Sequence, residues 1–155
     1  MAAEAEAELG NTTAALDYVN RVRARAANPA GFVAGSPAKY EIGLYTSFAS
    51  PAEALRAIRF ERKLELGMEG HRFFDLVRWD NAGDKSKLPF DIVQYVNSEY
   101  LAKEKNKRSH LANATFTRKY KYLPIPEFVI TQGTVQGVKK IDQSTDWGGS
   151  RALGN

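Results

Sequence analysis

Apolar and polar residues recur with a helical period through the first part of the chain. Residues 1–9 are strong helix formers that end at Gly10, a residue able to take the left-handed backbone of a helix end. A second helix is expected from Thr12 or Thr13 to about Ala27, because Leu16, Val19, Val22 and Ala26 follow helical spacing. The pattern predicts an antiparallel helical hairpin over 1–28, of the kind that tetratricopeptide repeats use.

The next strong signal is a helix start at Ser50-Pro51-Ala52-Glu53. Ser50 is the expected N-cap, Pro51 suits the first turn, and Glu53 completes a capping box. We expect this helix to continue towards Gly67 or Gly70 and a second helix to cover residues 71–79. A further amphipathic helix is predicted from Pro89 to about residue 105.

The remaining segments carry turn residues instead of a helical period. Residues 30–49 and 81–87 are expected to be loops, and residues 111–155 to form short extended pieces interrupted by proline and glycine. The predicted fold class is therefore mainly α, with a tetratricopeptide-like hairpin, further packed helices and an irregular C-terminal tail. We expect a single domain over 1–155, with the helices of 50–80 at its centre.

Composition narrows the function classes. The chain has 155 residues, 43% of them hydrophobic, which suits one globular domain. It contains no cysteine and two histidines, so a disulfide scaffold, a thiolate zinc site, a Cys nucleophile and a His-rich metal site are excluded. The net charge of +4 gives weak support to a nucleic-acid partner. No nucleophile elbow, P-loop or dinucleotide fingerprint is present, so we expect no enzymatic activity.

Residues 59–80 contain the densest charge pattern. Glu61, Glu65 and Glu69 recur every four residues and stack on one helical face, where like charges repel. We expect the arginines 59, 62, 72 and 78 to neutralise them in a buried or half-buried network, with Trp79 and Phe73-Phe74 in the core beside it. If the network is buried, replacing Glu65 or Arg72 should cost a few kcal/mol. The full predicted network is Glu61, Arg62, Glu65, Glu69, His71, Arg72, Asp75, Arg78 and Trp79.

Two sharper interpretations of this segment fit less well. A helix-bundle metal site would need Glu-x-x-His pairs, and position 68 is Met, so we predict no metal and no cofactor. A glycosidase would use two acids such as Glu61 and Glu65, but acids on consecutive turns of one helix usually face their own counter-ions and not a substrate.

The same segment resembles the signature of the SusD/RagB family, outer-membrane nutrient-binding lipoproteins of Bacteroidetes. The resemblance rests on Glu61-Arg-Lys-Leu-Glu-Leu66, Glu69-Gly-His-Arg-Phe-Phe-Asp-Leu76 and Arg78-Trp79, with departures at Lys63 and Val77. The segment 19–26 is similar to the family's last tetratricopeptide helix, and Tyr122-Leu-Pro-Ile-Pro126 to its closing segment. Three motifs in the family's order cover nearly the whole chain, which we interpret as the C-terminal portion of such a protein.

The resemblance implies binding without chemistry. It implies capture of an oligosaccharide or similar nutrient at the cell surface and delivery to a SusC-like TonB-dependent transporter. The membrane attachment would come from an N-terminal lipid anchor outside this chain. Sugars are held by stacked aromatic rings and polar side chains, and the candidates here are Tyr40, Tyr45, Phe48 and Trp147.

Two other binding functions remain open from the sequence. Seven cations, with Phe116, Tyr120 and Tyr122 among them, lie in one short window, as on surfaces that bind single-stranded nucleic acids: Lys103, Lys105, Lys107, Arg108, Arg118, Lys119 and Lys121. No helix-turn-helix, OB-fold or RRM signature accompanies them. A helical-repeat module that binds a peptide is the second alternative.

Overall fold

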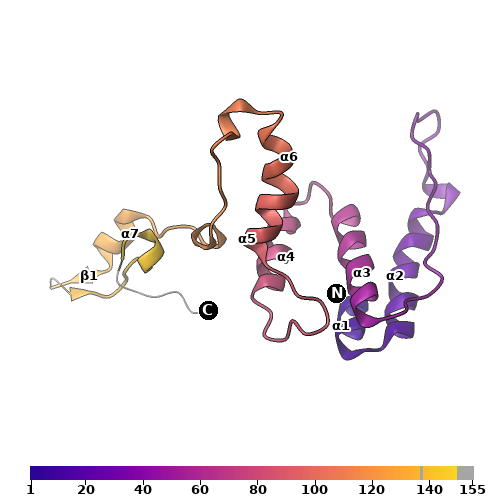
Figure 1. Ribbon diagram of the computed structural model, residues 1–155, viewed down its shortest axis with the longest axis horizontal. Coiled ribbons are helices and arrows are strands. Elements are labelled where there is room, and N and C mark those ends of the chain that lie inside the picture. Colours follow the sequence, from indigo (N-terminus) through magenta and orange to yellow (C-terminus); the bar gives the residue numbers. More distant parts are fainter. Residues whose placement is uncertain (137, 150–155) are drawn as a thin grey trace. The chain divides into compact units, whose positions relative to one another are not determined.

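The computed structural model of the chain describes residues 1–136 and 138–149 (Figure 1). It is mainly helical, as the sequence predicts. Two compact units are present: one comprises Met1–Asp75 with Gly83–Pro89, and the other comprises Leu76–Ala82 with the described residues from Phe90 onward. Each unit is described by itself below. The single domain over 1–155 stays a prediction, and residues 137 and 150–155 of the expected tail lie outside the described residues.

The first unit is built on α1 (Ala2–Leu9), α2 (Thr12–Ala26) and α3 (Pro51–Glu65), which pack against one another (Figure 1). Gly10 ends α1 with a φ of 88°, which confirms the predicted turn of the hairpin. Asn11, rather than a threonine, precedes α2, and its side chain donates to Glu6 over 2.8 Å. The core of this unit consists of small and aliphatic side chains: Ala3, Ala7, Ala15, Val19, Ala54, Leu55 and Ile58.

The start of α3 follows the predicted cap chemistry. The Ser50 hydroxyl accepts the Glu53 N–H at 3.2 Å, and Pro51 occupies the first turn. The Glu53 carboxylate accepts the N–H of Ala49 at 2.7 Å, one residue before the cap residue. Helix α3 ends at Glu65, and after a turn over 66–70 the chain enters α4 (His71–Asp80).

The second unit contains the end of α4 and one long helical segment. This segment is made of α5 (Ile92–Tyr95), the π-type turn η2 (Val96–Leu101) and α6 (Ala102–Lys105). It begins after the predicted Pro89 because Asp91 acts as the N-cap and accepts the Gln94 N–H at 2.9 Å. The buried core of the second unit consists of Leu76, Trp79 and Ile92, and partly buried aromatic rings pack around them.

The expectation that three aromatic residues of α4 are buried is correct for one of them. Trp79 is 3% exposed, as predicted, whereas Phe73 and Phe74 are 40% and 73% exposed. The prediction for the two phenylalanines is therefore wrong. Helix α4 buries Leu76 and Trp79. Phe74 lies about 200° around the helix from Leu76, so Phe74 and Leu76 cannot face the same core.

The tail after residue 105 is irregular, as predicted, except for one short helix. It contains the 3₁₀ turns η3 (Ser109–Leu111), η4 (Arg118–Lys121) and η5 (Thr145–Trp147), which resemble η1 (Pro29–Gly31) of the first unit. Helix α7 (Glu127–Gln132) follows Pro126 and was not expected. The strands β1 (Thr134–Val135) and β2 (Val138–Lys139) form a small antiparallel hairpin in which Val135 lies opposite Val138.

Candidate ligand-binding site

The glutamates of α3 are neutralised by α2. Arg23 forms an ion pair with Glu61, and Arg25 forms one with Glu65. The sequence analysis assigned this role to the arginines 59, 62, 72 and 78, so the expected pairing requires correction. The physical reason is helix packing: α2 lies against α3 and presents its own cations to the acidic face. Arg59 instead approaches Glu4 and Glu8 of α1, at 3.8 and 3.5 Å.

The other residues of the predicted network have separate surroundings. Arg62 donates to Asp75 over 2.6 Å and thereby connects α3 to the start of α4. His71 is exposed, and its Nε2 lies 3.9 Å from a Glu69 oxygen. Arg72 lines a hollow of about 200 Å³ beside the turn between α3 and α4, together with Arg62 and Asp75. Arg78, in the second unit, lies over the Trp79 ring at 5.6 Å.

One of the four candidate aromatics, Tyr45, is fixed by side chains of α2. The Asn20 side chain donates to the Tyr45 carbonyl at 2.8 Å and accepts the Tyr45 N–H at 2.9 Å. Arg23 donates to the Gly43 carbonyl at 2.6 Å, and its guanidinium lies 4.6 Å from the Tyr45 ring centre. Tyr45 and Phe48 are half-buried and pack against the core of the first unit. Their placement is that of packing residues at the base of a loop.

Tyr40 lies farther along the same loop. Its ring stacks on Phe32 at 4.1 Å and is nearly parallel to it, and its hydroxyl accepts the Val33 N–H at 3.3 Å. Phe32 therefore covers one face of the Tyr40 ring. Among the described residues, no cation lies over the Tyr40 ring, and its partner Phe32 belongs to the same loop. Tyr40 is therefore a secondary candidate.

Trp147 belongs to a larger group in the second unit. Its ring lies 5.9 Å from that of Tyr120, edge to face, and Tyr120 lies 5.9 Å from Phe116. The Lys119 ammonium lies 5.1 Å from the Tyr120 ring centre and 5.0 Å from that of Trp147. We call Phe116, Lys119, Tyr120 and Trp147 the aromatic–lysine cluster. Tyr120 is 44% exposed and the Trp147 ring is half-buried, so the cluster reaches the surface.

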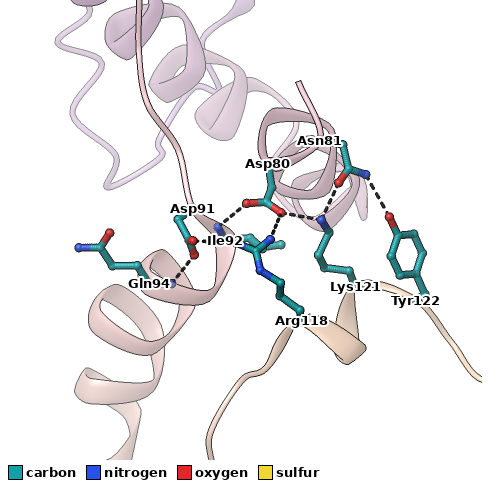
Figure 2. Close-up of polar contacts among 8 residues, drawn as sticks. All are labelled: Asp80, Asn81, Asp91, Ile92, Gln94, Arg118, Lys121 and Tyr122. Carbon is teal, nitrogen blue, oxygen red and sulfur yellow. Dashed lines mark hydrogen bonds and ion pairs between the residues drawn. The ribbon is translucent and has the colours of Figure 1, made fainter. Parts of the chain in front are cut away.

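The turn η4, which carries Lys119 and Tyr120 of the cluster, is held by the buried carboxylate of Asp80, whose contacts Figure 2 shows. The Asp80 side chain is completely buried and lies at the end of α4. It accepts the Ile92 N–H at 3.1 Å, the Lys121 ammonium at 2.5 Å and the Arg118 guanidinium at 3.1 Å. Because residues three apart eclipse one another on a 3₁₀ turn, Arg118 and Lys121 share one side of η4. Lys119 and Tyr120 are therefore directed to its other sides.

The groups around Asp80 determine the pKa of its carboxyl group. Burial by itself raises the pKa of a carboxyl group, but the Lys121 ammonium, the Ile92 N–H and the Arg118 guanidinium all favour the ionised form. Their combined effect holds the pKa of Asp80 below its ordinary value. Asp80 is thus a charged anchor for η4 at neutral pH.

Two amide side chains hold the backbone segments before and after η4. Asn97, in η2, donates to the Phe116 carbonyl at 2.9 Å and accepts the Phe116 N–H at 3.0 Å. Gln143 makes the same paired contact with Ile125, at 3.1 and 3.3 Å, shortly before η5 brings in Trp147. Three elements far apart in the sequence therefore converge on one group of rings. Sequence analysis missed Asp80, Asn97 and Gln143, because no local pattern relates them to their distant partners.

Most cations of the basic window between residues 103 and 121 form ion pairs in the structure. Arg118 and Lys121 pair with Asp80, and Arg118 also pairs with Asp91. Lys103 pairs with Glu99, while Lys107 and Arg108 pair with Glu104. A surface that binds nucleic acid needs cations available to phosphates, and most of these already have carboxylate partners. This weakens the nucleic-acid alternative.

A cavity of about 410 Å³ opens among α1, α2 and α3 of the first unit. Its walls are mostly aliphatic, and its glutamates Glu61 and Glu65 are paired with arginines of α2. Tyr18 is the one aromatic side chain among its lining residues. The cavity therefore lacks the group of rings that sugar stacking requires.

No group of three or more His, Cys, Asp or Glu side chains within 1–136 and 138–149 is arranged to hold a metal ion. Nor does this part of the chain contain a helix that is both long enough and apolar enough to cross a membrane.

Comparison with known proteins relates the chain to a family but to no individual protein. No curated protein and no solved structure matches the chain significantly. The model of the SusD family matches residues 1–147, almost the full length. Proteins of this family bind glycans and related nutrients without catalysing a reaction, and they are generally associated with the outer membrane and with SusC-like transporters. The chain therefore belongs to the SusD family of nutrient-binding proteins.

Proposed function

We propose that this chain binds a glycan nutrient at the aromatic–lysine cluster and contributes to its delivery to a SusC-like TonB-dependent transporter. The proposal places the protein at the cell surface of a Bacteroidetes bacterium, as part of an outer-membrane lipoprotein. Membership of the SusD family supports the general role. The observation that carries the site is the convergence of Tyr120 and Trp147 on Lys119, with Phe116 packed against Tyr120.

The chemistry of the cluster suits a sugar. Pyranose rings present C–H faces that pack on aromatic rings, and their hydroxyl groups accept hydrogen bonds from a lysine ammonium. The Tyr120 ring and the Trp147 ring supply the apolar surface, and Lys119 supplies the donor. No acid–base pair or nucleophile is required for this role.

The anchors make the cluster rigid before a ligand arrives. Asp80 fixes η4, Asn97 fixes the backbone of Phe116, and Gln143 fixes the segment before η5. A site whose rings are already in place loses less conformational entropy on binding than one on a mobile loop. This distinguishes the cluster from Tyr40, whose contacts lie within one loop.

Affinity electrophoresis tests the proposal. The purified chain is run through native gels that contain a panel of neutral and acidic polysaccharides, at two salt concentrations. We expect one polysaccharide to retard the wild-type chain and W147A to migrate freely in that gel. The matched control is F128A, which removes an exposed ring of the same unit that lies outside the cluster.

The outcomes separate the candidate functions. Retardation that W147A retains and Tyr40→Ala abolishes would move the site to the loop of the first unit. Free migration of the wild-type chain in every gel would refute glycan binding by these residues. Nucleic-acid binding predicts retention on a phosphate polymer that collapses between low and moderate salt.

A further inference from the structure

We propose that the aromatic–lysine cluster selects acidic glycans, with Lys119 as the specificity-determining residue that pairs with a sugar carboxylate or sulfate. This inference rests on the proposed function and names the ligand class of the same site. Three points support it: aromatic rings hold the Lys119 ammonium, the neighbouring cations pair with Asp80, and a charged acceptor binds an ammonium more strongly than a neutral one.

Lys119 is held by rings rather than by acids. Its ammonium lies 5.1 Å from the centre of Tyr120 and 5.0 Å from that of Trp147. Aromatic faces attract a cation without neutralising it, so the ammonium keeps its full charge and its capacity to donate hydrogen bonds. The two rings thus position a positive charge at the stacking surface.

The neighbours of Lys119 differ from it in their partners. Arg118 and Lys121, on either side of the Lys119–Tyr120 pair, form ion pairs with Asp80. Within the part of the chain that the structure describes, no carboxylate oxygen lies within 4.0 Å of the Lys119 ammonium, and Asp146, next to Trp147 in the sequence, makes no ion pair with it. The turn therefore contains two cations that stabilise the fold and one that remains available to a ligand.

A charged acceptor gains more from this arrangement than a hydroxyl group. The ammonium donates a charge-assisted hydrogen bond to either acceptor, but a carboxylate or sulfate adds the Coulombic attraction between opposite charges. The half-buried setting of Lys119 among rings reduces screening by solvent. We therefore expect acidic sugars to bind about tenfold more tightly than neutral sugars of the same size.

The experiment compares two ligands of equal length, of which one carries carboxylates and the other neutral hydroxymethyl groups in their place. Oligogalacturonate and its carboxyl-reduced counterpart of equal length are titrated calorimetrically into the wild-type chain, K119M, K119R and K105M. Native gels containing alginate or chondroitin sulfate extend the test to other acidic polymers. K119M removes the charge and keeps a stem of similar length, K119R keeps the charge, and K105M is the matched control. Lys105 belongs to the same basic window but to α6, outside the cluster.

The expected result has a definite pattern. At least one acidic glycan binds the wild-type chain, K119M weakens that binding about tenfold, and K119R and K105M retain it. Binding of the reduced, neutral ligand is the same in the wild-type chain and in K119M. Moderate salt weakens the acidic complex slightly, as expected for one ion pair.

Other results overturn the inference in distinguishable ways. Equal affinity for acidic and neutral ligands, or retardation in neutral gels alone, refutes acidic selectivity and leaves the proposed function standing. Equal losses for both ligands in K119M would show that Lys119 merely supports the rings. Absence of binding to every acidic and every neutral glycan would refute both proposals together.

Discussion

Replacing Asp80 by asparagine should destabilise the second unit strongly. The substitution keeps the size of the side chain and keeps an oxygen for the Ile92 N–H, but it removes the negative charge. The Lys121 side chain is 8% exposed and would lose its buried counter-ion. Removing one partner of a buried ion pair typically costs 3–5 kcal/mol, because the remaining charge stays buried without compensation. Arg118 is largely exposed and should add less than about 1 kcal/mol.

The expected loss for D80N is therefore about 3 kcal/mol of unfolding free energy. Urea denaturation followed by tryptophan fluorescence measures it directly, because both tryptophans of the chain, Trp79 and Trp147, belong to the second unit. Unfolding curves for the variants give the difference in free energy from their midpoints and slopes. Circular dichroism at 222 nm reports the helices of both units in parallel.

Asp91→Asn is the matched control. Asp91 also pairs with Arg118, at 2.9 Å, but its side chain is 41% exposed, and asparagine caps a helix as well as aspartate does. We expect a loss below about 1 kcal/mol for this variant. A second variant that combines D80N with K121M removes the orphaned ammonium and should recover part of the loss. If D80N loses no more than D91N, the argument that Asp80 is a buried anchor is wrong.

Three further predictions concern pH and the first unit. The pKa of Asp80 is lower in the folded state than the unfolded value of about 3.9. The stability that ionised Asp80 contributes is therefore complete above the unfolded pKa and is lost as the pH falls through the folded pKa. Acid unfolding of D80N, followed by fluorescence, should lack this pH-dependent loss. Glu61→Gln should cost about 2 kcal/mol by circular dichroism, because the half-buried Arg23 would lose its carboxylate partner. Glu65→Gln should cost less than about 1 kcal/mol, and equal losses for the two variants would refute the distinction. Ser50→Ala should cost about 1 kcal/mol through loss of the α3 cap, and Ser50→Thr, which keeps the hydroxyl, should restore most of it in the same assay.

The prediction for Glu65 shows how burial changes the interpretation of a sequence pattern. The spacing of Glu61 and Glu65 treats the two residues as equivalent members of one acidic face. In the structure Glu61 is buried and its partner Arg23 is half-buried, whereas the Glu65 pair is largely exposed. The substitution at Glu65 that the sequence analysis expected to be costly for a buried network should therefore have a small effect.

Part of the candidate binding site could be predicted from the sequence. Trp147 was a candidate because the family resemblance implies that sugars stack on aromatic rings, and Trp147 is such a residue in the glycine-rich tail. Lys119 and Tyr120 appeared as part of a basic and aromatic window, without a connection to Trp147. The connection required the positions of η4 and η5, which Asp80 and Gln143 fix over long separations in the sequence.

The sequence by itself determined the local features of this protein. The cap at Ser50, the glycine turn at Gly10, the mainly helical fold and the family motifs all depend on residues within a few positions of one another, where backbone preferences and hydrogen-bond geometry decide. Tertiary structure alone decided which cations neutralise Glu61, why Phe74 faces outward and which rings surround Lys119. These outcomes depend on which surfaces meet after the chain has folded, and one-dimensional spacing contains no information on the partner across such a contact.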